Sequence, residues 1–279
     1  MPPLTLAATF EECNHSALMG SKTKRLQRLK REHPICYFCA TNPTETEDHV
    51  PSRECFRNRV WPEGYVFPAC KRCNHASSQF EQVVALYLMM ANHDEAEPAA
   101  DQFRKLVFGV ANNNPELLPG VNLGARAARN HFRERGLMLA PGKAYADTPI
   151  LELPAKNRAA FELFSRRLTC ALFYKEVGRP VPLDHSIISA WTPWAEPNAH
   201  VAAMKAVGVF PQLCITNRRN VDIEGQFTYR WGVDDAGSVF GFAAEFSRSY
   251  FIFGAVAAPS LNPVQAGWKL HAEDITPSL

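Results

Sequence analysis

Apolar residues recur at helical spacing in one long stretch near the middle of the chain. Between residues 157 and 177, the apolar positions that share one helical face are Phe161, Phe164, Leu168, Ala171 and Leu172. Gly178 follows, and glycine is the residue that most readily adopts the left-handed conformation after the last turn of a helix. The pattern therefore predicts a helix over about residues 157–177 with one buried face.

Residues 210–258 follow the alternating pattern of β-strands instead. Apolar side chains occupy every second position in two runs, Phe227, Tyr229 and Trp231 and then Phe240, Phe242, Ala244 and Phe246. The sequence Asp234–Gly237 between them is typical of a hairpin turn. Tyr250–Val256 is predicted to form a further strand, so this region should fold as a sheet.

The first third of the chain has a less regular pattern. Residues 21–32 favour a short helix with Ser21 as its N-cap and Pro34 beyond its end. Residues 35–81 are rich in proline, cysteine and charge, with only short strand-like pieces. A helix is expected to begin near Asn74 or Ser78 and to continue through Val83–Met90, a run that is apolar on all sides like a buried helix.

Composition narrows this picture to a folded chain. Hydrophobic residues make up 46% of the 279 residues and charged residues 21%, a balance that excludes a disordered protein. We expect an α+β fold with an N-terminal arm and basic helix (1–32), a small module (33–95) and a larger helical-then-β domain (96–279). No apolar run is long enough to cross a bilayer and no export signal is visible, so a cytoplasmic protein without membrane contact is expected.

Four of the eight cysteines form two Cys-x-x-Cys pairs, Cys36 with Cys39 and Cys70 with Cys73. The two-residue gap lets both sulfurs of a pair reach the same ion, and four thiolates suit tetrahedral Zn²⁺. A module this small has few core side chains and needs such a link. We therefore predict a structural zinc site; the alternative is that the pairs are redox motifs or arise by coincidence.

Two further motifs lie between and after the cysteine pairs. Glu47-Asp48-His49-Val50-Pro51 stands between them, and the second pair continues directly into Asn74. This combination, over about residues 33–90, resembles the HNH endonuclease family. The resemblance implies a ββα-metal fold, in which a β-hairpin and a following helix surround a catalytic metal ion, and it makes residues 33–95 a metal-dependent nuclease module.

Phosphodiester hydrolysis needs a base to deprotonate water and a cation to stabilise charge on the phosphate. Histidine is the side chain best suited to act as a base near neutral pH, and hard divalent ions prefer oxygen ligands. The resemblance implies that His49 is the general base and that Asp48 and Asn74 hold a catalytic Mg²⁺ or Mn²⁺, separate from the zinc. Ser78 and Glu81 follow Asn74 by one and two helical turns and are candidates for further ligands.

One position departs from the family pattern. The family usually has an asparagine about nine residues before the helix asparagine, and Tyr65 stands there in this chain. Tyrosine can donate a hydrogen bond but does not reproduce an amide. The alternative function is therefore a catalytically inactive, zinc-stabilised module that binds nucleic acid. A third reading is a protein-interaction role led by the C-terminal domain.

Basic residues gather on both sides of the motif. The expected contacts to DNA phosphates are Lys22, Lys24, Arg25, Arg28, Lys30 and Arg31 on the first helix, and Arg53, Arg57, Arg59, Lys71 and Arg72 near Asp48 and His49. Such contacts position the protein without reading sequence, and they leave RNA open as a substrate. The role of residues 96–279 and the presence of a homodimer are left open.

Overall fold

The computed structural model describes residues 21–91, 97–193 and 209–260, apart from short gaps at residues 123, 135, 137, 140–141, 143, 148–149, 220, 222, 224 and 248. The helices are α2 (Ser21–Glu32), α3 (Lys71–Ala91), α4 (Glu97–Asn113), α5 (Ala125–Glu134) and α6 (Ala155–Val177), with short 3-10 turns at Arg53–Cys55, Arg57–Arg59, Pro115–Leu117 and Tyr145–Asp147. The strands are β1 (Thr46–His49), β2 (Val66–Ala69), β3 (Gly120–Asn122), β4 (Ile150–Glu152), β5 (Ser186–Pro193), β6 (Gln212–Ile215), β7 (Thr228–Val233), β8 (Val239–Phe246) and β9 (Tyr250–Ala257). The predicted mixture of helix and sheet is confirmed.

The described strands at the C-terminal end form one antiparallel sheet in the order β5-β9-β8-β7-β6. The predicted hairpin joins β7 to β8, where the Asp234 amide donates to the Val239 carbonyl at 3.0 Å and Gly237 adopts a φ of 63°. The predicted strand at Tyr250–Val256 is β9, which extends one residue further. The alternating apolar pattern therefore located these strands correctly.

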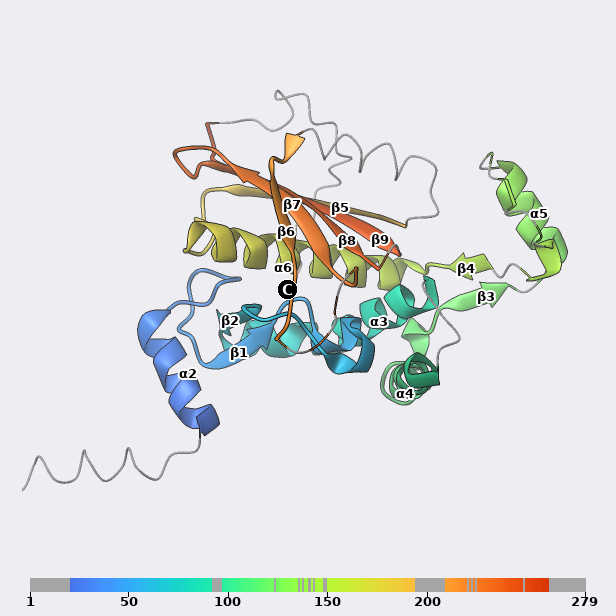
Figure 1. Cartoon of the computed structure of the whole chain (residues 1–279), viewed down its shortest axis with the longest axis horizontal. Helices are drawn as coiled ribbons and strands as arrows, with labels where there is room; N and C mark the ends of the chain where they lie inside the picture. Colours follow the sequence, from blue (N-terminus) through green and yellow to red (C-terminus); the bar gives the residue numbers. More distant parts are fainter. Residues whose placement is uncertain are drawn as a thin grey trace, which may run out of the picture.

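Helix α6 confirms the helical periodicity of its sequence. It runs over Ala155–Val177, and the amide of Gly178, at φ 82°, donates to the Tyr174 carbonyl and closes the last turn. Figure 1 shows α6 lying along the sheet with α3 on its other side, so α6 is the layer between them. The sheet lies close to α6 at Gly254 of β9, where an added Cβ would be 2.3 Å from Thr169 Oγ1 of α6. Only glycine fits there, because any side chain would separate β9 from α6.

Helix α3 begins earlier than predicted. The sequence pattern placed its start near Asn74 or Ser78, but the helix starts at Lys71 and the Asn74 amide donates to the Cys70 carbonyl at 3.1 Å. The reason is that the second cysteine pair folds as the first turn of the helix. Asn74 is therefore a helical residue, and its side chain is free to face the hairpin.

The hydrophobic core continues across the predicted boundary near residue 95. Phe56 and Tyr65, before the boundary, pack edge-on against Phe227 of the C-terminal region at ring-centroid distances of 6.4 and 5.8 Å. Helices α3 and α6 also pack together along their lengths. Among the described helices, none combines the length and the apolar composition needed to cross a bilayer.

Candidate functional site: a cysteine cluster beside a polar pocket

The four paired cysteines meet at one point. The first pair lies in the loop before β1 and the second at the start of α3, and all four Sγ atoms lie within 4.8 Å of one another. The first loop is closed by the Cys36 amide, which donates to the Asn42 carbonyl at 2.9 Å, and by Ala40, which adopts a φ of 56°. The cluster therefore joins the hairpin to the helix.

The chemistry of this cluster fits a structural metal ion such as zinc. Backbone amides of Asn42 and Cys73 donate to the sulfurs of Cys39 and Cys70 at 3.5 and 3.4 Å, which stabilises thiolates. A hydrogen bond with the Cys73 thiol lowers the pKa of Cys36 to about 4. The same hydrogen bond raises the pKa of Cys73, so within the cluster one thiol ionises at the expense of its neighbour. Four closely spaced cysteine sulfurs are the ligand set that tetrahedral zinc prefers.

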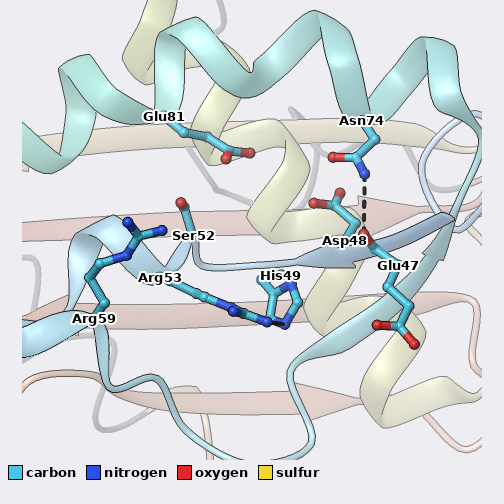
Figure 2. Close-up of a pocket in the computed structure, with 8 residues that line it drawn as sticks. All are labelled: Glu47, Asp48, His49, Ser52, Arg53, Arg59, Asn74 and Glu81. Carbon is cyan, nitrogen blue, oxygen red and sulfur yellow. Dashed lines mark hydrogen bonds between the residues drawn. The ribbon is translucent and has the colours of Figure 1, made fainter. Parts of the chain in front are cut away.

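The hairpin next to this cluster positions Asp48 and His49. Strands β1 and β2 are antiparallel, with Asp48 opposite Phe67 and His49 opposite Val66. Because neighbouring residues of a strand point to opposite faces, the two side chains diverge. In Figure 2, Asp48 points toward α3 and His49 toward the other side of the strand. Both nevertheless line one pocket, which also includes Glu47, Ser52, Arg53, Arg59, Asn74 and Glu81.

Asp48 is held by two partners from other parts of the chain. Its carboxylate is buried, Tyr37 Oη donates to Oδ2 at 2.8 Å, and the Arg167 guanidinium donates to the same oxygen. Burial raises the pKa of Asp48, and the positive charge of Arg167 opposes that shift. The described contacts all use Oδ2, so Oδ1 is the oxygen available to a ligand in the pocket.

Arg167 is a site residue that the sequence analysis missed. It lies on α6 with its side chain 3% exposed, donates to the Cys73 carbonyl at 2.6 Å and lies 3.9 Å from Glu81 Oε1. One signal was present in the sequence. Arg167 stands between Phe164 and Leu168, two predicted core positions, and a buried arginine requires an anionic partner.

Asn74 and Glu81 face the pocket from α3. Asn74 Nδ2 donates to the Glu47 carbonyl at 3.1 Å and to Thr46 Oγ1 at 3.3 Å, which turns the amide oxygen away from the β1 backbone. Burial, then the nearby charge of Asp48, raises the pKa of Glu81 to about 7. The structure thus brings Asp48, Asn74 and Glu81 together across one pocket, as Figure 2 shows.

Ser78 is not brought to this group. It is exposed, and its hydroxyl donates to the His75 carbonyl of its own helix at 3.0 Å. Ser77 lies beside Glu81 instead: it is 1% exposed, and its single hydroxyl hydrogen is shared between the Asn74 carbonyl and Glu81 Oε1, each 3.0 Å from Oγ. The hydroxyl that orients Glu81 is therefore that of the preceding residue.

His49 lies at the end of β1 in a partly buried position. Its ring packs edge-on against Trp61 at 5.1 Å between centroids, and its Nε2 is 2.6 Å from Arg53 Nη2. Burial, then the charge of Arg53, lowers the pKa of His49 to about 4. The imidazole is therefore neutral at physiological pH, and because arginine only donates, Nε2 accepts in this contact.

Tyr65, at the position where the family usually has asparagine, turns away from the pocket. Its hydroxyl donates to Tyr229 Oη at 3.3 Å, and Tyr229 in turn donates to Glu176 Oε1 at 2.6 Å. Only its backbone serves the loop after His49, since its carbonyl accepts from the Val50 amide at 3.3 Å. The Tyr65 side chain therefore connects the hairpin to the C-terminal sheet and does not orient His49.

The predicted basic residues divide into two groups. Arg53 lines the pocket together with Arg59, whereas the basic side chains of α2 and those of Arg57, Lys71 and Arg72 are exposed and do not line it. Some are already paired: Arg25 with Glu47, Arg28 with Glu32, Arg59 with Glu54, and Lys71 with Glu45. The positive charge of the pocket itself therefore comes from Arg53 and Arg59, which lie beside the carboxylates of Glu47, Asp48 and Glu81.

Comparisons with protein-family models, with curated proteins and with solved structures found no match for this chain. The chemistry of the site is therefore the guide to the function. Chemically, the pocket offers carboxylate and amide oxygens for a hard cation, a neutral imidazole, and guanidinium groups for an anion.

Proposed function

We propose that this protein is an HNH-type, metal-dependent nuclease that hydrolyses phosphodiester bonds in DNA, with RNA left open. One observation carries the proposal: a short antiparallel hairpin and the helix that follows it, joined by the cysteine cluster, bring Asp48, Asn74 and Glu81 to one pocket beside His49. This is the arrangement expected of the ββα-metal fold that the sequence motifs resemble. Zinc in the cysteine cluster would have only a structural role.

The oxygen atoms of the pocket fit a second, hard divalent ion. Asp48 Oδ1, the amide oxygen of Asn74 and the Glu81 carboxylate are the donor types that Mg²⁺ and Mn²⁺ prefer. Bound there, the ion would stabilise negative charge on the phosphate. Arg167 balances one of the two carboxylates, so the group retains a net charge of −1 when both are ionised.

The candidate to receive a proton from the attacking water is His49, and the burial and Arg53 charge that lower its pKa keep it neutral but also weaken it as a base. It is neutral, and its ring is oriented by Trp61 and Arg53. The accepting atom would be Nε2, which Arg53 contacts in this structure, so the Arg53 guanidinium has to turn from His49 to the substrate phosphate. Arginine has five N–H donors and binds phosphate in a bidentate manner, which favours this exchange.

Two observations favour a second candidate, a zinc-stabilised nucleic-acid-binding module without catalysis. Oδ2 of Asp48 already accepts from both Tyr37 and Arg167, and Nε2 of His49 is occupied by Arg53. A module of this kind needs only the cysteine cluster and the basic surface. It would bind DNA in a salt-dependent manner and leave it intact.

The test is nicking of supercoiled plasmid by the purified protein with Mg²⁺, with Mn²⁺ and with EDTA. His49→Ala removes the proposed base, and His75→Ala is the matched control because His75 is exposed on α3 outside the pocket. We expect metal-dependent nicking that falls at least about 100-fold in His49→Ala and is unchanged in His75→Ala.

Zinc content is measured on each sample, so that loss of a catalytic ion is distinguished from loss of the cysteine site. Equal nicking by both histidine variants would refute the assigned base. Absence of nicking with either ion, together with retained DNA binding and one zinc per chain, would support the binding module instead.

A further inference from the structure

Three side chains converge on Trp61. The guanidinium carbon of Arg53 lies 3.8 Å from the centre of the Trp61 ring and that of Arg218 lies 4.2 Å from it. The His49 ring packs edge-on against the same indole at 5.1 Å between centroids. The indole thereby gathers Arg53, which contacts the proposed base, and Arg218 on one ring. Stacking on an aromatic face fixes the plane of a guanidinium, and within that plane Arg53 can still turn from His49 to a phosphate.

Arg218 comes from the C-terminal region, more than 150 residues from Trp61 in sequence. Its Nη1 donates to the Trp61 carbonyl at 2.9 Å. Two further hydrogen bonds join the loop after β6 to the loop before β2: the Glu63 amide donates to the Asn217 carbonyl at 3.1 Å, and the Arg219 amide donates to Glu63 Oε1 at 3.2 Å. The position of Arg218 is therefore determined by the fold.

The charge of these two arginines is not neutralised within the described part of the chain. Arg25 and Arg59 nearby are paired with Glu47 and Glu54, whereas no carboxylate of the described residues lies within 4.0 Å of Arg53 or Arg218. Arg53 Nε is buried and has no hydrogen-bond partner among these residues. Burial and the neighbouring guanidiniums of Arg59, Arg25 and Arg218 lower the pKa of Arg53. An unsatisfied donor among crowded positive charges favours an anionic ligand.

We propose that Arg53 and Arg218, stacked on Trp61, form a phosphate subsite that holds the nucleic-acid backbone beside His49, so that the C-terminal region supplies part of the substrate cleft. The proposal rests on the proposed function insofar as the ligand is a nucleic acid. Planar, oriented guanidiniums suit the bidentate geometry of a phosphodiester. Because phosphate contacts are independent of sequence, the subsite would act on any backbone that reaches the cleft.

The experiment measures DNA affinity by fluorescence anisotropy of a labelled duplex, without added Mg²⁺ or Mn²⁺, over a series of salt concentrations. Arg218→Gln removes the charge, and Arg219→Gln is the matched control because Arg219 is the neighbouring exposed arginine and uses only its backbone amide in the loop contact. Arg218→Lys keeps the charge in case the glutamine disturbs the loop. Thermal unfolding of each variant reports whether the fold is retained.

Losing one phosphate contact should lower the slope of log affinity against log salt by about 0.9 and weaken binding about eightfold at 0.1 M salt. We expect this of Arg218→Gln alone, with the slope restored in Arg218→Lys and wild-type binding in Arg219→Gln. Equal losses in Arg218→Gln and Arg219→Gln would overturn the subsite, since they would reflect general surface charge. Wild-type binding by Arg218→Gln, or no binding of duplex DNA or of single-stranded RNA by the wild type, would overturn it as well.

Plasmid nicking distinguishes this proposal from the proposed function. If Arg218→Gln loses affinity while the wild type never nicks, the subsite stands and the nuclease does not. If the wild type nicks through His49 and Arg218→Gln binds and nicks normally, the nuclease stands and the subsite does not.

Discussion

The hairpin region (33–91) and the C-terminal region (97–260) obtain their structure by different means. In the first, two strands of four residues each are joined to α3 by four cysteines, and the buried aromatic rings of Tyr37, Phe56, Phe67 and Tyr87 belong to a core shared with the second region. In the second, strands of up to eight residues stack an aromatic core on α6. The first region places its chemistry in short contiguous motifs. The second contributes isolated residues that contact them: Arg167 pairs with Asp48, and Arg218 stacks on Trp61.

The difference shows that the site depends on residues of both regions, although its sequence motif lies in the first region alone. The motif residues occupy a hairpin that would expose most of its surface alone, and a small module of this kind depends on a metal or a partner for stability. The C-terminal region supplies both a packing surface and the cation that compensates Asp48. Substitutions in each region therefore test how far one depends on the other.

The largest effect is expected at the cysteine cluster. Cys70→Ser should abolish stoichiometric zinc binding and lower the free energy of unfolding by more than about 4 kcal/mol, because a structural metal contributes directly to folding. Zinc content and denaturant unfolding are the measurements. Cys214→Ser is the control, since Cys214 lies on β6 outside the cluster and should retain one zinc per chain. Retained zinc and stability in Cys70→Ser would contradict the assignment.

The second largest effect concerns the link between the regions. Arg167→Met should cost about 3–5 kcal/mol in denaturant unfolding, because it leaves the buried Asp48 carboxylate without its cation. Arg166→Met, on the half-exposed side of the same helix, should cost less than about 1 kcal/mol. Combining Arg167→Met with Asp48→Asn should recover part of the loss. A small effect of Arg167→Met would mean that the contact between Arg167 and Asp48 does not stabilise the packing of the two regions.

A smaller effect is expected at Tyr65. Tyr65→Phe removes one hydrogen bond to Tyr229 and should lower the free energy of unfolding by about 1 kcal/mol, with nicking unchanged. Tyr65→Asn introduces the residue usual in the HNH family but also removes the ring that packs against Phe227, so it should destabilise more without increasing nicking. Increased nicking by Tyr65→Asn would show instead that the tyrosine limits activity.

The regularly patterned parts of the chain were predicted well. The helix ending before Gly178, the hairpin at Asp234–Gly237 and the strand beginning at Tyr250 all follow from side-chain periodicity and turn chemistry. The start of α3 was misplaced because the cysteine pair, which looks like an irregular loop in sequence, is itself a helical turn. Helical spacing pointed to Ser78, but the hydroxyl that contacts Glu81 is that of Ser77, one position earlier.

By itself, the sequence predicted the cysteine site from the two-residue gap within each pair, and placed Glu81 on the helical face of Asn74 from the spacing between them. The candidate roles of Asp48, His49 and Asn74 came from the resemblance of their motifs to the HNH family. Only the tertiary structure decided that Arg167 compensates Asp48, that Tyr65 turns to Tyr229, and that Arg218 reaches Trp61. These contacts join residues 119, 164 and 157 positions apart, respectively. The packing of α6 between the sheet and α3 brings them together, and no local pattern in the chain encodes that distance.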